Sequence, residues 1–121
     1  MPYIRTLDLS RRTISNETAM TLLENLSALD LDELILAESK IETIDLIFLR
    51  KSIRWKNLKT LNLFCNKIGE KGADYLSNNQ IWTNLQALNL SWNNIGDKGA
   101  EYLSYNKTWT NLQTQFNREY Y

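Results

Sequence analysis

Histidine is absent from the 121-residue sequence, and cysteine occurs once, as Cys65. Without histidine, the chain lacks the side chain that most often serves as a general base or a metal ligand near neutral pH. Cys65 has no second cysteine with which to form an internal disulfide, which favours a reducing compartment over a secreted, disulfide-bonded scaffold. We therefore expect no catalytic residues, no metal site and no cofactor.

Net charge is also missing, because 14 Lys and Arg residues balance 14 Asp and Glu residues. A balanced chain has no strong overall field with which to attract nucleic acid or an anionic membrane. The N-terminal segment MPYIRTLDLS shows no basic stretch followed by an apolar run, so we expect no signal peptide, and no membrane-spanning segment is predicted. These features favour the cytoplasm, although delivery into another cell by a signal-independent route stays open.

A period of 27 residues dominates what the sequence does contain. Its clearest columns are Leu7, Leu34, Leu61 and Leu88; Leu9, Leu36, Leu63 and Leu90; and Ile14, Ile41, Ile68 and Ile95. Such a period is typical of units that cannot bury their own apolar face and stack on their neighbours. We expect a single repeat domain over 1–121, with repeats at roughly 3–29, 30–56, 57–83 and 84–110 and a partial one at 111–121.

The repeats at 57–83 and 84–110 are the most regular, with 17 of 27 positions identical. Alternation at Leu61-Asn62-Leu63 predicts a short parallel strand, and the following GEKGADYLS predicts a helix whose entry turn is relaxed by Gly69 or Gly72. At the end of each strand, Asn66 and Asn93 are expected to point inward. Their amides would then satisfy backbone groups of the bend and of the next repeat.

A fourth column holds Trp55, Trp82 and Trp109. Large aromatic side chains bury well against one another, so we interpret this column as a plug between each helix and the next strand rather than as a cofactor site. Repeat-specified residues usually serve stacking, which supports that interpretation.

The pattern L-x-x-L-x-L-x-x-N-x-I at 58–68 and 85–95 resembles the leucine-rich repeat family. The motif I-G-x-K-G-A-x-Y-L-S at 68–77 is similar to the ribonuclease-inhibitor-like subfamily. The resemblance implies an α/β solenoid, a short horseshoe of about four 27-residue strand-turn-helix repeats with a partial fifth strand. It also implies a parallel sheet on the concave face and helices on the convex side.

The pattern weakens toward both ends of the chain. Arg12 and Ser39 stand where asparagine is expected in the first two repeats, and Gln115 and Asn117 replace the inward leucines of the fifth. The apolar N-terminal layer needs a cover, from residues 1–3 or from another chain. The ends thus predict either a piece of a longer repeat protein or association through terminal repeats.

On a horseshoe, the outward positions of the strands form the natural ligand face. Phe64 and Trp92 interrupt otherwise polar columns there, and large aromatics are the side chains that anchor interface hot spots. A single exposed aromatic needs no special explanation, so both interpretations stay open. The candidate partner-binding residues are Arg11, Ile35, Glu38, Asn62, Phe64, Asn89, Ser91 and Trp92.

Charges follow the period as well. Arg5, Asp32 and Lys59 share a column, so neighbouring repeats can pair opposite charges, whereas the basic cluster within 50–59 lacks any dedicated nucleic-acid motif. The leading prediction is a protein-binding module that uses the concave sheet and has no enzymatic activity. The alternative is a structural or self-associating repeat segment of a larger leucine-rich repeat protein.

Overall fold

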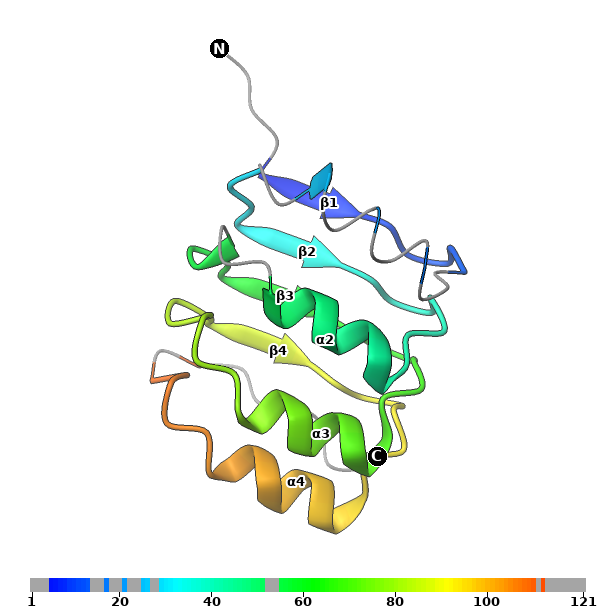
Figure 1. Ribbon diagram of the computed structural model, residues 1–121, viewed down its shortest axis with the longest axis vertical. Helices are drawn as coiled ribbons and strands as arrows, with labels where there is room; N and C mark the ends of the chain where they lie inside the picture. Colours follow the sequence, from blue (N-terminus) through cyan, green and yellow to red (C-terminus); the bar gives the residue numbers. More distant parts are fainter. Residues whose placement is uncertain are drawn as a thin grey trace.

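The computed structural model describes residues 5–13, 17, 21, 25–26, 29–51, 55–110 and 112. Four short strands form one sheet in the order β1-β2-β3-β4, namely β1 (Thr6–Asp8), β2 (Glu33–Ile35), β3 (Thr60–Asn62) and β4 (Ala87–Asn89). The described helices are α2 (Thr43–Lys51), α3 (Gly69–Ser77) and α4 (Gly96–Ser104). Figure 1 shows these helices on one side of the sheet. The opposite side, which carries the outward strand residues, is called the open face below.

All neighbouring strands are parallel, and each residue pairs with the residue one period later. Leu7 pairs with Leu34, Leu34 with Leu61, and Leu61 with Leu88. Because side chains alternate along a strand, this register turns every central leucine to the helix side and its two neighbours to the open face. The parallel strands expected from the alternation are confirmed.

The core lies between the sheet and the helices, and it is built from the periodic columns. Leu61, Leu88, Ile68 and Ile95 are at most 1% exposed. Trp55 and Trp82 are fully buried in the same apolar cluster, and Trp109 is nearly so. The structure thus places the tryptophan column in the core, as its interpretation as packing requires.

Each of the two regular helices contains glycine at two positions, and the two glycines have different roles. Gly69 and Gly96 adopt φ of +68° and +74°, a left-handed conformation that glycine adopts without steric cost. A Cβ added to Gly99 would lie 2.3 Å from the Cγ2 of Ile95 and 3.1 Å from the Cβ of Ala73. The first glycine of each motif therefore makes the turn, and the second leaves room for packing.

Inward asparagines close the bends after β3 and β4. The Nδ2 of Asn93 donates to the carbonyls of Leu63, Leu90 and Ser91, and its Oδ1 accepts from the backbone N–H groups of Asn66 and Ile68. Asn66 makes the equivalent bonds one period earlier.

The inward orientation and the bonds to the residue's own bend were predicted correctly, but the bonds expected to the next repeat are made to the preceding one. Asn93 reaches the bend of the preceding repeat, at Leu63, Asn66 and Ile68, rather than that of the following one. In the stack the amide lies between two bends: its own supplies the acceptors at Leu90 and Ser91, and the preceding one supplies the acceptor at Leu63 and both donors.

Several predictions concern residues outside those described. They include the helix of the first repeat, the cover formed by residues 1–3, and the polar substitutions at Gln115 and Asn117. In the part of the chain that is described, no helix is long and apolar enough to cross a membrane.

Candidate functional site

The open face is formed by columns of side chains that run across the four strands. The structure places most of the predicted site residues on it with accessible surface: Ile35, Asn62, Phe64 and Asn89 are half-buried, and Arg11, Glu38 and Trp92 are exposed. Trp92 retains 55% of its surface, which is a large exposed area for an apolar residue. The sheet therefore brings seven of the eight predicted residues to an accessible surface.

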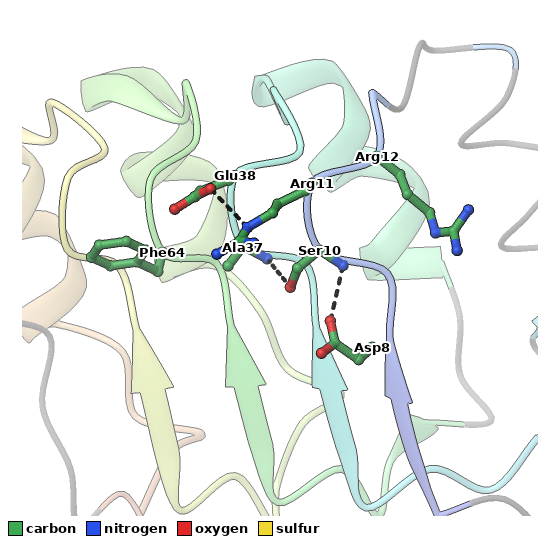
Figure 2. A pocket seen from close by; sticks show the side chains of 7 residues that line it. All are labelled: Asp8, Ser10, Arg11, Arg12, Ala37, Glu38 and Phe64. Carbon is green, nitrogen blue, oxygen red and sulfur yellow. Dashed lines mark hydrogen bonds and ion pairs between the residues drawn. The ribbon is translucent and has the colours of Figure 1, made fainter.

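Ser91 is the exception, because it is only 7% exposed. Its column neighbour is Phe64, which follows β3, and Figure 2 shows the Phe64 ring lying toward the chain that continues from β4. A short hydroxymethyl group beside so large a ring is shielded from solvent. The expectation that Ser91 offers an accessible side chain was wrong, and the surface of this column lies at Phe64.

A row of left-handed residues borders the open face where the strands end. Arg11, Glu38, Cys65 and Trp92 are one period apart and have φ of 63°, 55°, 56° and 63°. The first three donate their backbone N–H groups across the sheet, to the carbonyls of Ala37, Phe64 and Ser91 at 2.9, 2.8 and 2.9 Å. This conformation costs a non-glycine residue roughly 1–2 kcal/mol. The fold therefore holds four strained positions in one row, and each of them keeps a side chain.

Two members of this row form an ion pair. The Nε of Arg11 lies 3.3 Å from Oε2 of Glu38, and both side chains are largely exposed. They border an open hollow of about 630 Å³ at the β1–β2 end of the face (Figure 2), lined by Asp8, Ser10, Arg11, Arg12, Ala37, Glu38 and Phe64. The sequence indicated Arg11 and Glu38 as candidate partner-binding residues and did not predict that they pair.

Arg12 was not predicted as a residue of this face. It occupies the column of Asn66 and Asn93, but its side chain is exposed. A long cation cannot replace a fully buried amide without losing its solvation, so the chain turns it outward. The charged residue in a column of buried asparagines is the signal from which this position could have been predicted.

Short polar side chains on three strands bond to their own backbone. Asp8, Asn62 and Asn89 each accept a hydrogen bond from the N–H two residues later, at 2.9, 3.0 and 3.0 Å. This local turn is characteristic of Asp and Asn. Ile35 occupies the same column and cannot form it; instead the Ala37 N–H donates to Oγ of Ser10 at 3.2 Å.

The charge of Asp8 is stabilised by this arrangement. Hydrogen bonds from Ser10, through its side chain and its backbone, lower the pKa of the Asp8 carboxyl below its ordinary value, with a smaller contribution from Arg11. The carboxyl therefore remains ionised at neutral pH.

The two halves of the open face differ in charge. Four charged residues lie on β1, on β2 or shortly after these strands, namely Asp8, Arg11, Glu33 and Glu38. The residues of the same columns on and after β3 and β4 carry no charge. The second half carries amides and aromatics instead. One end of the face thus suits charged groups, and the other suits uncharged polar and apolar groups.

The side chains of this site, which are charged groups, amides and aromatic rings, are groups that bind a ligand. Among the described residues, no cluster of three or more His, Cys, Asp or Glu side chains is arranged to hold a metal ion. Cys65 is an exposed free thiol in the left-handed row.

At the opposite ends of the strands, the predicted pairing of charges between repeats is found in part. Arg5 lies 3.4 Å from Asp32 on the neighbouring repeat. In the same column, no ion pair joins Asp32 to Lys59 among the residues described. The exposed Arg5–Asp32 pair is of a kind that contributes at most about 1 kcal/mol.

Two segments of the chain match the model of a known family, described as the leucine-rich repeat, over residues 56–77 and 83–104. The first segment contains β3 and α3, and the second contains β4 and α4. A comparison with curated proteins finds no match. The matched segments coincide with the two repeats in which leucines, glycines and the inward asparagine are all present.

Proposed function

Since the two matched segments support the leucine-rich repeat family, whose repeats commonly act as protein-interaction modules, we propose that this chain binds a protein partner through the open face of its sheet. The observation that carries the proposal is the exposure of Trp92 at 55%, on the repeat that follows the one carrying half-buried Phe64. Aromatic side chains of this kind supply most of the binding energy of protein interfaces.

Other details complete the proposal. The chain forms one domain over 1–121, curved as a short ribonuclease-inhibitor-like horseshoe with the open face on its concave side. It acts in the cytoplasm by binding rather than by catalysis, and it engages neither nucleic acid nor membrane. The balanced charge and the lack of histidine support this view.

An affinity capture tests the proposal. The partner captured by the wild-type chain is identified, and its affinity is then measured for the double variant Phe64→Ala/Trp92→Ala. Loss of two anchors should weaken binding by at least ~2 kcal/mol, or roughly thirtyfold. Tyr105→Ala is a matched control because Tyr105 is 66% exposed and follows α4, away from the open face. Equal affinities for the double variant and the wild type would refute binding at this face.

Self-association is a second candidate, supported by the state of β1. Leu7 and Leu9 are only half-buried, whereas Leu34 and Leu36, the equivalent residues one period later, are at most 3% exposed. Within the described residues β1 pairs with β2 alone, which leaves one edge of the strand for another chain. Sedimentation over a wide concentration range tests this candidate, and a monomer at every concentration would exclude it.

A further inference from the structure

We propose that the segment bound by the open face is an extended peptide. Its main-chain carbonyls accept hydrogen bonds from Asn62 and Asn89, and a Lys or Arg side chain lies over Asp8. This inference rests on the proposed protein-binding function and specifies the chemistry of the partner. It follows from one column of the sheet, which contains Asp8, Ile35, Asn62 and Asn89 in that order across the strands.

The two asparagines present oriented donors. The Oδ1 of Asn62 accepts from the N–H of Phe64 at 3.0 Å, and the Oδ1 of Asn89 accepts from the N–H of Ser91 at 3.0 Å. Because the oxygen of each amide is held against the backbone, the nitrogen is the group left to meet a ligand. Neither Nδ2 makes a hydrogen bond within the described part of the chain, and an amide nitrogen only donates. A ligand over these residues must therefore offer acceptors.

Main-chain carbonyls are the acceptors that match this pair. Asn62 and Asn89 lie on adjacent strands, about 4.8 Å apart in the direction across the sheet. An extended peptide points a carbonyl to the same side at every second residue, about 6.6 Å apart, so hydrogen bonds that diverge slightly from Asn62 and Asn89 reach two successive carbonyls on that side. Recognition through carbonyls leaves the partner's side chains free to contact Phe64, which follows Asn62 by two positions.

The other end of the column has the opposite character. Asp8 holds its Oδ1 against the N–H of Ser10 at 2.9 Å, as the asparagines do, but its second oxygen accepts and carries charge. Hydrogen bonds from Ser10 hold the pKa of Asp8 below its ordinary value, so the charge persists at neutral pH. A cationic side chain matches this oxygen, whereas a carbonyl would meet it unfavourably. Ile35 separates the two ends with an apolar surface.

The spacing sets the length of the recognised segment. The column crosses three strand intervals of about 4.8 Å each, or about 14 Å in all. An extended chain advances about 3.3 Å per residue, so about four residues connect the cation over Asp8 to the carbonyl over Asn89. We expect an aliphatic or aromatic side chain near that second end, against Phe64.

Neutral oligosaccharides also combine hydrogen-bond acceptors with a surface that packs on aromatic rings. Their hydroxyls can donate to the carboxylate of Asp8, but they carry no cation to form the charge-paired hydrogen bonds that stabilise a carboxylate most. The charge of Asp8 therefore favours a peptide over a glycan, and the experiment includes both.

The full chain, immobilised, is screened against a phage library of random heptapeptides, and the selected peptides are synthesised for affinity measurement. We expect the selected sequences to carry Lys or Arg three to five residues from an aliphatic or aromatic residue, as the roughly 14 Å span requires. A series of maltooligosaccharides is titrated in parallel and should not bind.

Isosteric substitutions then test each end of the column. Asn62→Asp/Asn89→Asp keeps the acceptor for the backbone N–H groups but replaces both outward donors, and should weaken peptide binding at least tenfold. Gln80→Glu/Asn94→Asp adds the same charge at two exposed positions outside the column and should leave binding unchanged. Asp8→Asn should abolish the preference for Lys over norleucine at the cationic position. Circular dichroism establishes that each variant is folded.

A change in the ligand gives a test that leaves the protein intact. Replacing the peptide bond over Asn62 by a reduced CH₂–NH unit removes one carbonyl, and should also weaken binding at least tenfold. Equal binding of this peptide and its parent overturns the inference, as does selection of no peptide or binding of the sugars alone.

The outcomes separate this inference from the proposed function. If the asparagine variants bind like the wild type while Phe64→Ala loses the peptide, protein binding at the open face stands and recognition by carbonyls falls. If Phe64→Ala and all column variants bind like the wild type, both are overturned.

Discussion

The two halves of the sheet share the leucine columns and the register but differ in what surrounds them. On the β3–β4 side, Leu61 and Leu88 are completely buried, and an inward asparagine closes each bend. On the β1–β2 side, Leu7 is half-buried, and Arg12 and Ser39 occupy the asparagine column. The leucine columns alone therefore specify the strands. The residues of the asparagine column determine how completely each layer is closed.

The difference extends to the open face. The half with regular bends presents uncharged amides and aromatics, and the other half presents Asp8, Arg11 and Glu38. Residues of the core are constrained by stacking, whereas the open face tolerates change at each repeat. Among the central strand leucines, Leu34, Leu61 and Leu88 are buried and only Leu7 retains contact with solvent, so stability is lowest at the β1 end, and chemical variety lies on the open face. Four predictions test this division, beginning with the largest expected effect.

Asn93→Ala should be the most damaging. Asn93 is completely buried and satisfies five backbone groups, so its loss leaves several of them without partners. We expect a loss of roughly 3–5 kcal/mol in the free energy of unfolding, measured by urea titration. The matched change Ser39→Ala removes a hydroxyl that bonds only to the carbonyls of Leu9 and Ala37, and should cost about 1 kcal/mol. Equal losses would contradict the comparison.

Truncation of equivalent leucines gives the second test. Leu88→Ala should cost about 3 kcal/mol, because a fully buried side chain leaves a cavity. Leu7→Ala should cost roughly half as much, because Leu7 already retains contact with solvent. Urea unfolding of both variants measures the difference, and a larger effect at Leu7 would reverse the assigned distribution of stability.

Asp45 in α2 gives a smaller effect that depends on pH. It occupies the column of Gly72 and Gly99 and is only 4% exposed. Burial raises the pKa of its carboxyl above the ordinary value of 3.8, against an opposing hydrogen bond from the Glu42 N–H. The folded state thus binds this proton more tightly than the unfolded state, so the contribution to stability falls as pH rises from about 3.8 through the folded pKa.

Asp45→Asn should remove this dependence. The amide oxygen still accepts from the Glu42 N–H, but no charge is buried, so we expect a gain of roughly 1 kcal/mol at pH 7. Below pH 3.8 the carboxyl is neutral in both states, and the advantage should vanish. Urea titrations at several pH values measure the difference between variant and wild type. A constant difference at all pH values would show that the charge of Asp45 is not responsible.

The Arg11–Glu38 pair should matter least for stability. Both side chains are largely solvated, and exposed pairs contribute about 0.2–1 kcal/mol. Glu38→Gln should therefore change the free energy of unfolding by less than 1 kcal/mol, and even less in 1 M salt, where charges are screened. A loss comparable to that of Leu88→Ala would mean that the charged half contributes to the fold as strongly as the apolar half.

The sequence was sufficient to predict the strands and their register, since Leu34, Leu61 and Leu88 pair at the spacing of the repeat. It also predicted the helix at 69–77 and the inward orientation of Asn66. It did not predict the direction in which Asn66 and Asn93 bond, because that depends on which neighbouring bend lies within reach of the amide. Periodicity specifies which residues are equivalent and carries no information about side-chain partners.

The site was predictable only in outline. Strand alternation placed Asn62, Asn89 and Phe64 on the open face, but it did not distinguish shielded Ser91 from accessible Phe64. The left-handed row at Arg11, Glu38, Cys65 and Trp92 also escaped prediction. Glycine usually marks this conformation, and here non-glycine residues adopt it because hydrogen bonds across the sheet compensate the strain.

The four tryptophans provide the most direct measurement of the central claim, which is that a partner binds the open face. Trp92 is exposed there, whereas Trp55, Trp82 and Trp109 are buried in the core. Titration of ¹⁵N-labelled protein with the captured partner should shift or broaden the indole signal of Trp92 and leave the other three nearly unchanged. Binding that leaves the Trp92 signal in place while other surface signals move would contradict the account.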